Sequence, residues 1–301
     1  MSIYSSSSSS SSSSSFLRLA VQKKGRIGDE SLLLLEKAGF LFSVRDRELS
    51  VRVKNFPLEI VFLRNSDIPE LLADEIVDMA IVGQNTIFES EKRDLLSITK
   101  ELNFGRCSLS LAVPKGGDIT TLKGLEGKRI ATSYPRLLKT FLKDKGVSAD
   151  IIEMQGSVEI APALEIADAI CDLVSSGNTL RSHNLVEIEK MMTSEVCFTQ
   201  RNNLESAKKS LVEEVLLRVN SVLEAKILKS IICNAPKMAL IEIQKVLPGL
   251  DSPTIMPLLN PDWVALHSVV PEDEYFWEII KKLKELGASG ILIQPIERVI
   301  R

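Results

Sequence analysis

Short apolar runs alternate with amphipathic stretches along most of this chain. After Phe16, apolar runs at 17–21, 58–64 and 79–83 are typical of strands, and 49–53 pairs with 58–64 as a hairpin would. Residues 30–38 and 68–75 have the apolar spacing of helices. Strand-type and helix-type periods in alternation predict an α/β lobe built on one sheet.

A second set of alternating elements starts near Arg106. It contains apolar runs at 107–114, 128–133, 149–154 and 169–174, together with a helix-like stretch at 136–145. This set predicts a second α/β lobe with its own sheet. We expect the strands at 186–200 to return the chain to the first lobe, because two crossovers are usual when paired lobes form a ligand cleft.

The last part of the chain has a different order of elements. Strand-like runs and helix-like runs follow one another as βαββαβ, which is the ferredoxin-like unit. Pro236 at a helix start and Gly287 just beyond a helix end fit this assignment. The resulting expected domains are 16–105 for lobe I, completed by about 186–209, 106–185 for lobe II and 210–301 for the C-terminal domain.

Composition limits the function classes. The chain has 301 residues, of which 45% are hydrophobic and 26% charged, as in a soluble globular protein and not a fibre or a membrane span. The net charge of -3 gives no general attraction to nucleic acid, so small phosphorylated substrates fit better. Serines fill residues 5–15, and we expect residues 1–15 to be a disordered tail, with a targeting role as the alternative.

Cysteine and histidine usage narrows the chemistry further. The four cysteines form no CxxC pair, so they indicate neither a zinc site nor a redox motif. With only two histidines in the chain, we do not expect a histidine metal cluster or a catalytic triad. The cysteines are therefore expected to be reduced, and the protein cytoplasmic.

The most informative segment is 167–180, where an apolar strand with two acids enters a small, hydroxyl-rich turn. Backbone N–H groups of such a turn, at the start of a helix, converge on a phosphate, and Asp172 and Asp168 would accept hydrogen bonds from sugar hydroxyls. An ordinary polar turn is the alternative. A carboxylate on an apolar strand favours the first interpretation, because ligands of α/β sheets bind at open strand ends. The predicted ribose-phosphate turn is Ser175, Ser176, Gly177, Asn178 and Thr179.

Cationic side chains cluster where the first strand ends. Lys23 and Arg26 are suited to neutralise a triphosphate or a leaving pyrophosphate, although solvated loop charge explains them equally well. Other polar groups come after strands, and most have a simple alternative: Asp67 and Ser133 also suit helix N-caps, and residues 83–85 also suit an ordinary turn. The additional candidates after strands are Arg64, Asp67, Gly83, Asn85 and Ser133.

Six ordered blocks carry a resemblance to a known family: QKKGR at 22–26, DMAIVGQN at 78–85, NFGRCSLSLAVP at 103–114, GKRIATSYP at 127–135, QGSVEIAP at 155–162 and LVSSGNTL at 173–180. Together with LPGLDSPTIMPLL and LGASGILIQPIE near the C-terminus, they make the chain resemble the long-form ATP phosphoribosyltransferases. The resemblance covers essentially everything after the serines. Departures from the expected pattern are Lys24, Gly28, Gln84 and Asn103.

The resemblance implies two lobes like those of a periplasmic binding protein and a C-terminal ACT-like domain that binds histidine. It implies the first step of histidine biosynthesis, in which ATP and phosphoribosyl pyrophosphate give phosphoribosyl-ATP and pyrophosphate with Mg²⁺ held mainly by substrate phosphates. It also implies feedback inhibition by histidine and a homo-oligomer, as dimer and hexamer. By position, Asp172 and the turn hold the ribose phosphate. The ATP and pyrophosphate side has Lys23, Arg26, Gly83 and Asn85, extended to Arg64, Asp67, Arg106 and Ser133, and the histidine contacts are Asn234, Ala288 and Ser289.

Charge predicts the mechanism. Attack by an adenine ring nitrogen develops oxocarbenium character as pyrophosphate leaves, so Lys23 and Arg26 are the expected catalytic residues and no strong general base is expected. Two alternatives stay open at this point: a sensor module that binds a small molecule without turnover, and a phosphoribosyltransferase that acts on another base.

Overall fold

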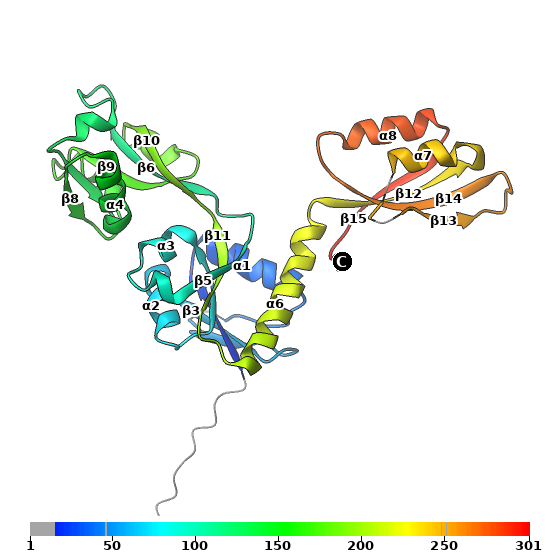
Figure 1. The fold of residues 1–301 in the computed structure, drawn as a ribbon, viewed down its shortest axis with the longest axis horizontal. Helices are drawn as coiled ribbons and strands as arrows, with labels where there is room; N and C mark the ends of the chain where they lie inside the picture. Colours follow the sequence, from blue (N-terminus) through cyan, green and yellow to red (C-terminus); the bar gives the residue numbers. More distant parts are fainter. Residues whose placement is uncertain (1–15, 46, 248, 251) are drawn as a thin grey trace, which may run out of the picture. The chain divides into compact units, whose positions relative to one another are not determined.

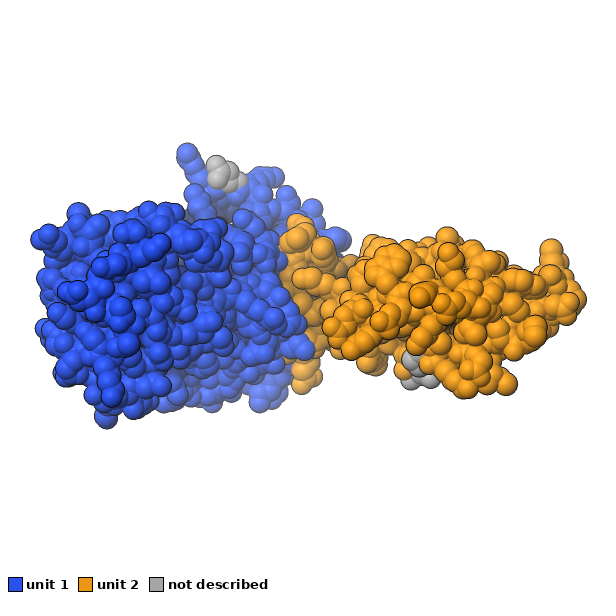
Figure 2. Space-filling view, turned by 90° about the horizontal axis from the view of Figure 1, so that it is seen from above, with its two compact units in different colours: residues 1–32, 41–212 blue, residues 33–40, 213–301 orange. Residues whose placement is uncertain are grey.

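The computed structural model describes residues 16–45, 47–247, 249–250 and 252–301. The expected serine tail at 1–15 lies outside these residues. The chain forms two compact units: the first contains the described residues up to Leu32 together with Leu41–Val212, and the second contains Leu33–Phe40 and Glu213–Arg301 (Figure 2). No helix among the described residues is both long and apolar enough to cross a membrane.

Lobe I is a six-stranded sheet in the first unit (Figure 1). Its central strand β1 runs parallel to both neighbours, β3 and β4, whereas β11 is antiparallel to β4 and β5. In sheet order the strands are β2 (Ser50–Arg52), β3 (Leu58–Leu63), β1 (Leu17–Gln22), β4 (Met79–Gly83), β11 (Val196–Arg201) and β5 (Leu96–Glu101). The helices are α1 (Arg26–Lys37), α2 (Ile68–Ala73) and α3 (Gln84–Glu89), with 3₁₀ turns at Asn65–Asp67 and Arg93–Leu95.

Lobe II is a five-stranded sheet in the same unit. Strands β7, β8 and β9 are parallel, and β6 joins β9 and β10 antiparallel. The order is β10 (Leu185–Ser194), β6 (Cys107–Pro114), β9 (Ala169–Val174), β7 (Arg129–Thr132) and β8 (Asp150–Glu153). The helices are α4 (Pro135–Lys145) and α5 (Asn178–Ser182), with 3₁₀ turns at Leu122–Leu125 and Val158–Ile160.

The return to lobe I occurs later than expected. The sequence placed both strands of 186–200 in lobe I, but β10 pairs along its length with β6 of lobe II, and only β11 joins the first sheet. The expectation for β10 was wrong because alternating polarity indicates a strand but not its partner.

Two chain segments connect the lobes, one between β5 and β6 and the other between β10 and β11. They pair with each other: Leu102 N donates to Val196 O at 2.9 Å, and Val196 N donates to Phe104 O at 3.1 Å. The first crossing contains two residues with left-handed backbone, Asn103 at φ 58° and Gly105 at φ 64°. A Cβ on Gly105 would lie 2.6 Å from Val196 Cγ2, so this crossing has room only for glycine.

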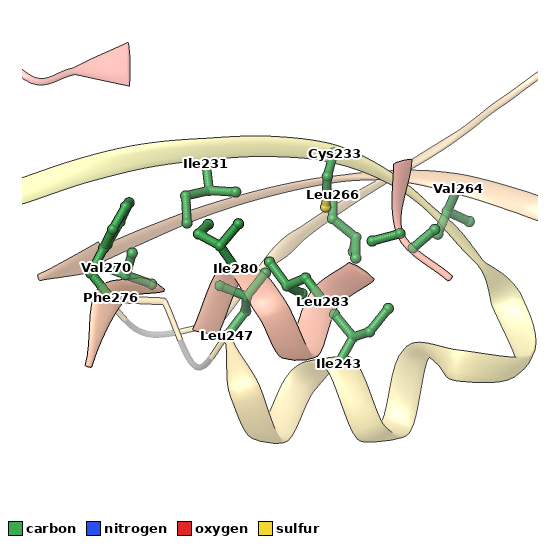
Figure 3. Close-up of a cluster of buried hydrophobic side chains, with 12 residues drawn as sticks. Ile231, Cys233, Ile243, Leu247, Val264, Leu266, Val270, Phe276, Ile280 and Leu283 are labelled. Carbon is green, nitrogen blue, oxygen red and sulfur yellow. The ribbon is translucent and has the colours of Figure 1, made fainter. Parts of the chain in front are cut away.

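The second unit has the predicted βαββαβ order, led by the helix α6 (Ser206–Ala225). Its antiparallel sheet has the order β13 (Thr254–Pro257), β14 (Trp263–Pro271), β12 (Leu228–Pro236) and β15 (Ser289–Pro295), which confirms the ferredoxin-like prediction. Helices α7 (Leu240–Val246), preceded by a 3₁₀ turn at Lys237–Ala239, and α8 (Phe276–Glu285) cover one face of the sheet. Apolar side chains of β12 and β14, such as Ile231 and Leu266, meet Ile243 and Leu283 from the helices (Figure 3).

A buried carboxylate anchors the start of β4 and of α6. Asp78 is only 1% exposed and accepts hydrogen bonds from Arg18 N at 2.9 Å and from Lys208 Nζ at 2.9 Å. Arg201, itself buried, donates to the same carboxylate at 3.1 Å. One carboxylate therefore compensates two cations from the end of β11 and the first turns of α6.

We predict that Asp78→Ala lowers the free energy of unfolding by about 3–5 kcal/mol, because it removes the buried counter-charge of Lys208 and leaves Arg201 with only the exposed carboxylate of Glu75, 3.1 Å away. Urea unfolding followed by circular dichroism measures the change. The matched control is Asp94→Ala, whose side chain is 91% exposed, and it should change the free energy of unfolding by less than about 0.5 kcal/mol. Equal effects of the two variants would contradict the anchoring role.

Candidate functional site

A pocket of about 530 Å³ lies where lobes I and II meet. Its wall includes the start of the predicted ribose-phosphate turn, Ser175, and one of the predicted ATP-side residues, Arg106. The other side chains come from the start of α3, from the ends of β5, β9 and β10, from the start of β6 and from the returning crossing. The complete lining is Gln84, Glu101, Arg106, Cys107, Ser108, Val174, Ser175, Thr193, Ser194 and Glu195.

Asp172 occupies the C-terminal half of β9, close to this pocket. The pKa of its carboxyl is raised, mainly because the group is buried. The N–H of Leu173 donates to Oδ1 at 2.7 Å and lowers this pKa, whereas the charge of Glu159 raises it. Ser110 stands opposite Asp172 on β6, and no described residue offers a partner to its buried hydroxyl. The two residues are therefore neighbours across the strands, and because Ser110 is 1% exposed, Asp172 is the member of the pair that a ligand could reach.

The turn after β9 has the predicted position at the carboxyl end of the strand. It passes through Gly177 at φ 70° and opens α5, which has only five residues. The Arg181 guanidinium folds back onto the turn, donating to Ser176 O at 3.0 Å and to Asn178 Oδ1. A helix this short contributes a weak dipole, so Arg181 supplies most of the positive charge beside the turn. Sequence reasoning missed this residue.

Asp168 does not join the site. It precedes β9, at the opposite end of the strand from Ser175, and pairs with Arg129 through Oδ1 at 3.2 Å and with Arg129 N through Oδ2 at 2.8 Å. This pairing lowers the pKa of the Asp168 carboxyl. The expected role of Asp168 in substrate binding is wrong, because Asp168 lies just before the start of β9 and the turn follows the end of that strand.

The cationic turn follows β1. Lys23 N donates to Leu63 O at 2.9 Å, which fixes the turn to β3, and Arg26 Nε lies 3.1 Å from Glu30 Oε1 while its side chain stays 66% exposed. Burial raises the pKa of the Cys107 thiol, and the charge of Arg26 lowers it. Since Cys107 lines the pocket, the charge of Arg26 acts on the pocket wall.

Asn85 has a role that the sequence did not indicate. It is 3% exposed, its Oδ1 accepts from Ser194 Oγ at 2.9 Å, and its Nδ2 donates to the Tyr134 hydroxyl at 3.0 Å. Asn85 belongs to lobe I, whereas Tyr134 and Ser194 belong to lobe II. A Cβ on Gly83 would lie 2.5 Å from Asn85 Oδ1, so Gly83 leaves space for this amide. The hydrogen bonds of the Asn85 side chain therefore join lobe I to lobe II.

Three other candidates have defined partners. Ser133 Oγ donates to Met154 O at 2.6 Å and caps no helix, and Asp67 accepts from Ser66 Oγ at 2.9 Å without capping α2, so both N-cap alternatives are wrong. Arg106 lies 3.1 Å from Glu195 Oε2 on the pocket wall. Arg64 precedes the 3₁₀ turn at Asn65–Asp67, one strand away from Lys23.

Gln84, one of the departures from the family pattern, has hydrogen-bond partners on both sides of its amide group. Its Nε2 donates to Glu101 Oε1 at 2.8 Å, and its Oε1 accepts from Glu195 N at 3.2 Å. An acid at this position would face the Glu101 carboxylate, so the amide fits where the family pattern led us to expect a charge.

The three expected histidine contacts come together in the second unit. Asn234 on β12 pairs in register with Ser289 on β15, next to an irregularity between Ile232 and Asn234. Ala288 directly precedes Ser289 and is buried. Within the described part of the chain, no group of three His, Cys, Asp or Glu residues could hold a metal ion.

The fold and the site define a two-lobed α/β protein of the periplasmic-binding-protein type that carries a ferredoxin-like C-terminal unit. The sequence model described as "ATP phosphoribosyltransferase" matches residues 64–221, and the model "HisG, C-terminal domain" matches residues 225–298. The chain therefore belongs to the ATP phosphoribosyltransferase family, in its long form.

Individual relatives agree with this membership. The chain is 48% identical over 284 residues to the ATP phosphoribosyltransferases of Parabacteroides distasonis and Bacteroides thetaiotaomicron, covering 94% of this chain and 99% of each relative. A solved structure, the ATP phosphoribosyl transferase (HisG:HisZ) complex from Thermotoga maritima, is similar with TM-score 0.61 and 27% identity, over 69% of this chain and 99% of that chain. These findings confirm the predicted transferase activity and histidine biosynthesis, and the family needs a divalent metal.

Gly28, another departure from the family pattern, fits its surroundings because it has no side chain. A Cβ at this position would lie 2.4 Å from Gln22 O, at the base of the cationic turn. We predict that Gly28→Ala displaces the turn and lowers the free energy of unfolding by about 1–3 kcal/mol, as overpacking does. Thermal unfolding measures it.

The matched control is Gly124→Ala, because the nearest atom to a Cβ there is Ile119 Cγ2 at 3.4 Å. Melting temperatures that fall equally in both variants would show that the contact with Gln22 has no special effect.

Proposed function

We propose that the pocket between lobes I and II binds both substrates of the transfer, with phosphoribosyl pyrophosphate on lobe II and ATP on lobe I. The observation that carries this proposal is the placement of Asp172 and the Ser175–Thr179 turn at one open sheet end beside the pocket. Lys23 and Arg26 supply positive charge from the other lobe. Lobe II thus offers groups for hydroxyl recognition and lobe I groups for phosphate neutralisation, and Ser175 among them lines the pocket itself.

The chemistry requires alignment and charge stabilisation. A bond forms between an adenine ring nitrogen and the anomeric carbon, while the bond from that carbon to the pyrophosphate oxygen breaks and its electron pair leaves with pyrophosphate. Lys23 and Arg26 stabilise the departing charge. Asp172 accepts hydrogen bonds from the ribose hydroxyls and does not act as a general base.

Magnesium is the proposed divalent metal. Mg²⁺ is commonly bound through one or two carboxylates and substrate phosphates, not through a cage of protein ligands. Asp172 lies on β9 three residues before Ser175, where the proposed phosphate turn starts, so it suits a site in which substrate oxygens supply most ligands. The ion would neutralise phosphate charge as pyrophosphate leaves.

The second unit is proposed to bind histidine as a feedback inhibitor through Asn234, Ala288 and Ser289. These residues combine a side-chain amide, a hydroxyl and an irregular strand pairing at one place. We further propose that the chain acts in the cytoplasm as a homo-oligomer, as dimer and hexamer, following the long-form family pattern.

The test of the substrate site is Asp172→Asn. Because hydrogen bonds to a charged acceptor are lost, we expect phosphoribosyl pyrophosphate to bind about 10- to 100-fold more weakly. Isothermal titration with phosphoribosyl pyrophosphate and Mg²⁺ measures the affinity, and pyrophosphate release after addition of ATP measures turnover.

The control is Asp168→Asn on the same strand. It removes the charge partner of Arg129 but should leave the affinity for phosphoribosyl pyrophosphate within about twofold. An unchanged affinity in Asp172→Asn, or an equal loss in the two variants, would refute the site assignment.

The regulatory proposal predicts a separate effect for Asn234→Ala. Loss of the amide should raise the histidine concentration for half inhibition about tenfold and leave turnover without histidine unchanged. The control is Gln244→Ala, an exposed residue of α7 in the same unit. If Asn234→Ala is inhibited as strongly as the wild-type protein, the assignment is wrong.

A further inference from the structure

We propose that Glu89 is a positioning residue for the transfer reaction, because its carboxylate holds the N-terminus of α4 and so sets lobe II against lobe I. The inference rests on the proposed function, which assigns the two substrates to different lobes. Glu89 is the last residue of α3 in lobe I, and α4 belongs to lobe II (Figure 1).

The geometry is that of a helix cap supplied by another lobe. Glu89 Oε1 accepts from Arg136 N at 2.8 Å, and Glu89 Oε2 accepts from Leu137 N at 3.0 Å. Both carboxylate oxygens are thus committed to free N–H groups in the first turn of α4. Because α4 has eleven residues, its N-terminus carries the partial positive charge that favours an anion.

The helix has no cap of its own. Tyr134 occupies the N-cap position and forms no side-chain cap hydrogen bond, and Pro135 brings no N–H to the first helical position. Arg136 and Leu137 therefore present the N–H groups that need a partner from outside the helix. Burial raises the pKa of the Glu89 carboxyl, and the two N–H groups lower it, so their contacts offset part of the cost of removing the charge from water.

Two additional contacts surround this cap. Asn85, at the start of α3, donates to the Tyr134 hydroxyl, and Glu91 pairs with the Arg136 side chain. Burial raises the pKa of the Tyr134 hydroxyl, and the charge of Asp172 raises it further, so Tyr134 lies within electrostatic reach of that carboxylate. Glu89 thus lies at the lobe contact that neighbours the proposed sugar site, and it acts through α4 without touching substrate.

A capping carboxylate that only stabilised α4 could come from α4 itself or from the residue before it. Here it comes from the other lobe, so a change in the angle between the lobes would break both hydrogen bonds at once. Misplacement of reacting groups by about 1 Å costs on the order of 100-fold in rate. The same contact that caps the helix therefore controls how the two substrates meet.

The test is Glu89→Gln, in which one carboxylate oxygen becomes an NH₂ group that faces an N–H donor. We expect kcat with both substrates saturating to fall about 10- to 100-fold, while phosphoribosyl pyrophosphate binding without ATP stays within about twofold of wild type. Hydrogen exchange should become faster at the amides of Arg136 and Leu137. Glu89→Asp, which keeps the charge on a shorter side chain, should recover part of kcat and carries the test if Glu89→Gln does not fold.

The matched control is Glu91→Gln, which removes the exposed ion pair with Arg136 across the same lobe contact but leaves both cap hydrogen bonds of Glu89 in place. Because an exposed ion pair contributes little, it should leave kcat within about twofold of wild type. An unchanged kcat in Glu89→Gln would overturn the inference. So would a fall in kcat matched by an equal fall in phosphoribosyl pyrophosphate affinity, since it would reveal general damage to lobe II. Failure of the substrate site itself would appear separately, as normal substrate affinity in Asp172→Asn.

Discussion

The pairing of the two crossing segments is the constraint on which the catalytic unit depends. Hydrogen bonds through Val196 tie the outgoing and returning chains together between the sheets. This pairing continues beyond the ladder in which Ser194 at the end of β10 pairs with Cys107 at the start of β6, so Arg106, Ser194 and Glu195 line one pocket although Arg106 is far from the other two in sequence. The two sheets supply the binding groups, and the crossings determine that those groups face a common space.

In the proposed site, the charges of the two lobes complement the two substrates. A chain with net charge -3 attracts no polyanion as a whole, and the cations proposed to meet the phosphates are local: Lys23 and Arg26 after β1, and Arg181 beside the turn after β9. Acids around the pocket, such as Glu195 with Arg106, are paired with neighbouring donors. Binding two phosphorylated substrates together therefore depends on the positions of a few side chains.

Sequence reasoning succeeded for the features that depend on local pattern. Periodicity predicted the ferredoxin-like order, and the polar run after an apolar stretch predicted a turn at the carboxyl end of β9. The phosphate-binding role of that turn stays a prediction. Sequence reasoning failed for features that depend on which distant residues a segment contacts. Asp168 and Asp172 are close in sequence, but they lie near opposite ends of β9. Asp168 is at the end that faces Arg129, and Asp172 is toward the end beside the pocket. The sheet of β10 and the contacts of Asn85 and Glu89 depend on distant segments, which no single-sequence pattern contains.

The crossing at Gly105 makes the two connections mechanically unequal. The outgoing segment turns through two left-handed residues, Asn103 and Gly105, and packs against Val196 with space for one hydrogen atom. The returning segment is strand on both sides of Glu195, with β10 ending at Ser194 and β11 starting at Val196. The outgoing connection therefore depends on residues that tolerate a left-handed backbone, and the returning one does not. A larger residue at Gly105 would push the two connections apart and displace the nearby start of β6, which lines the pocket.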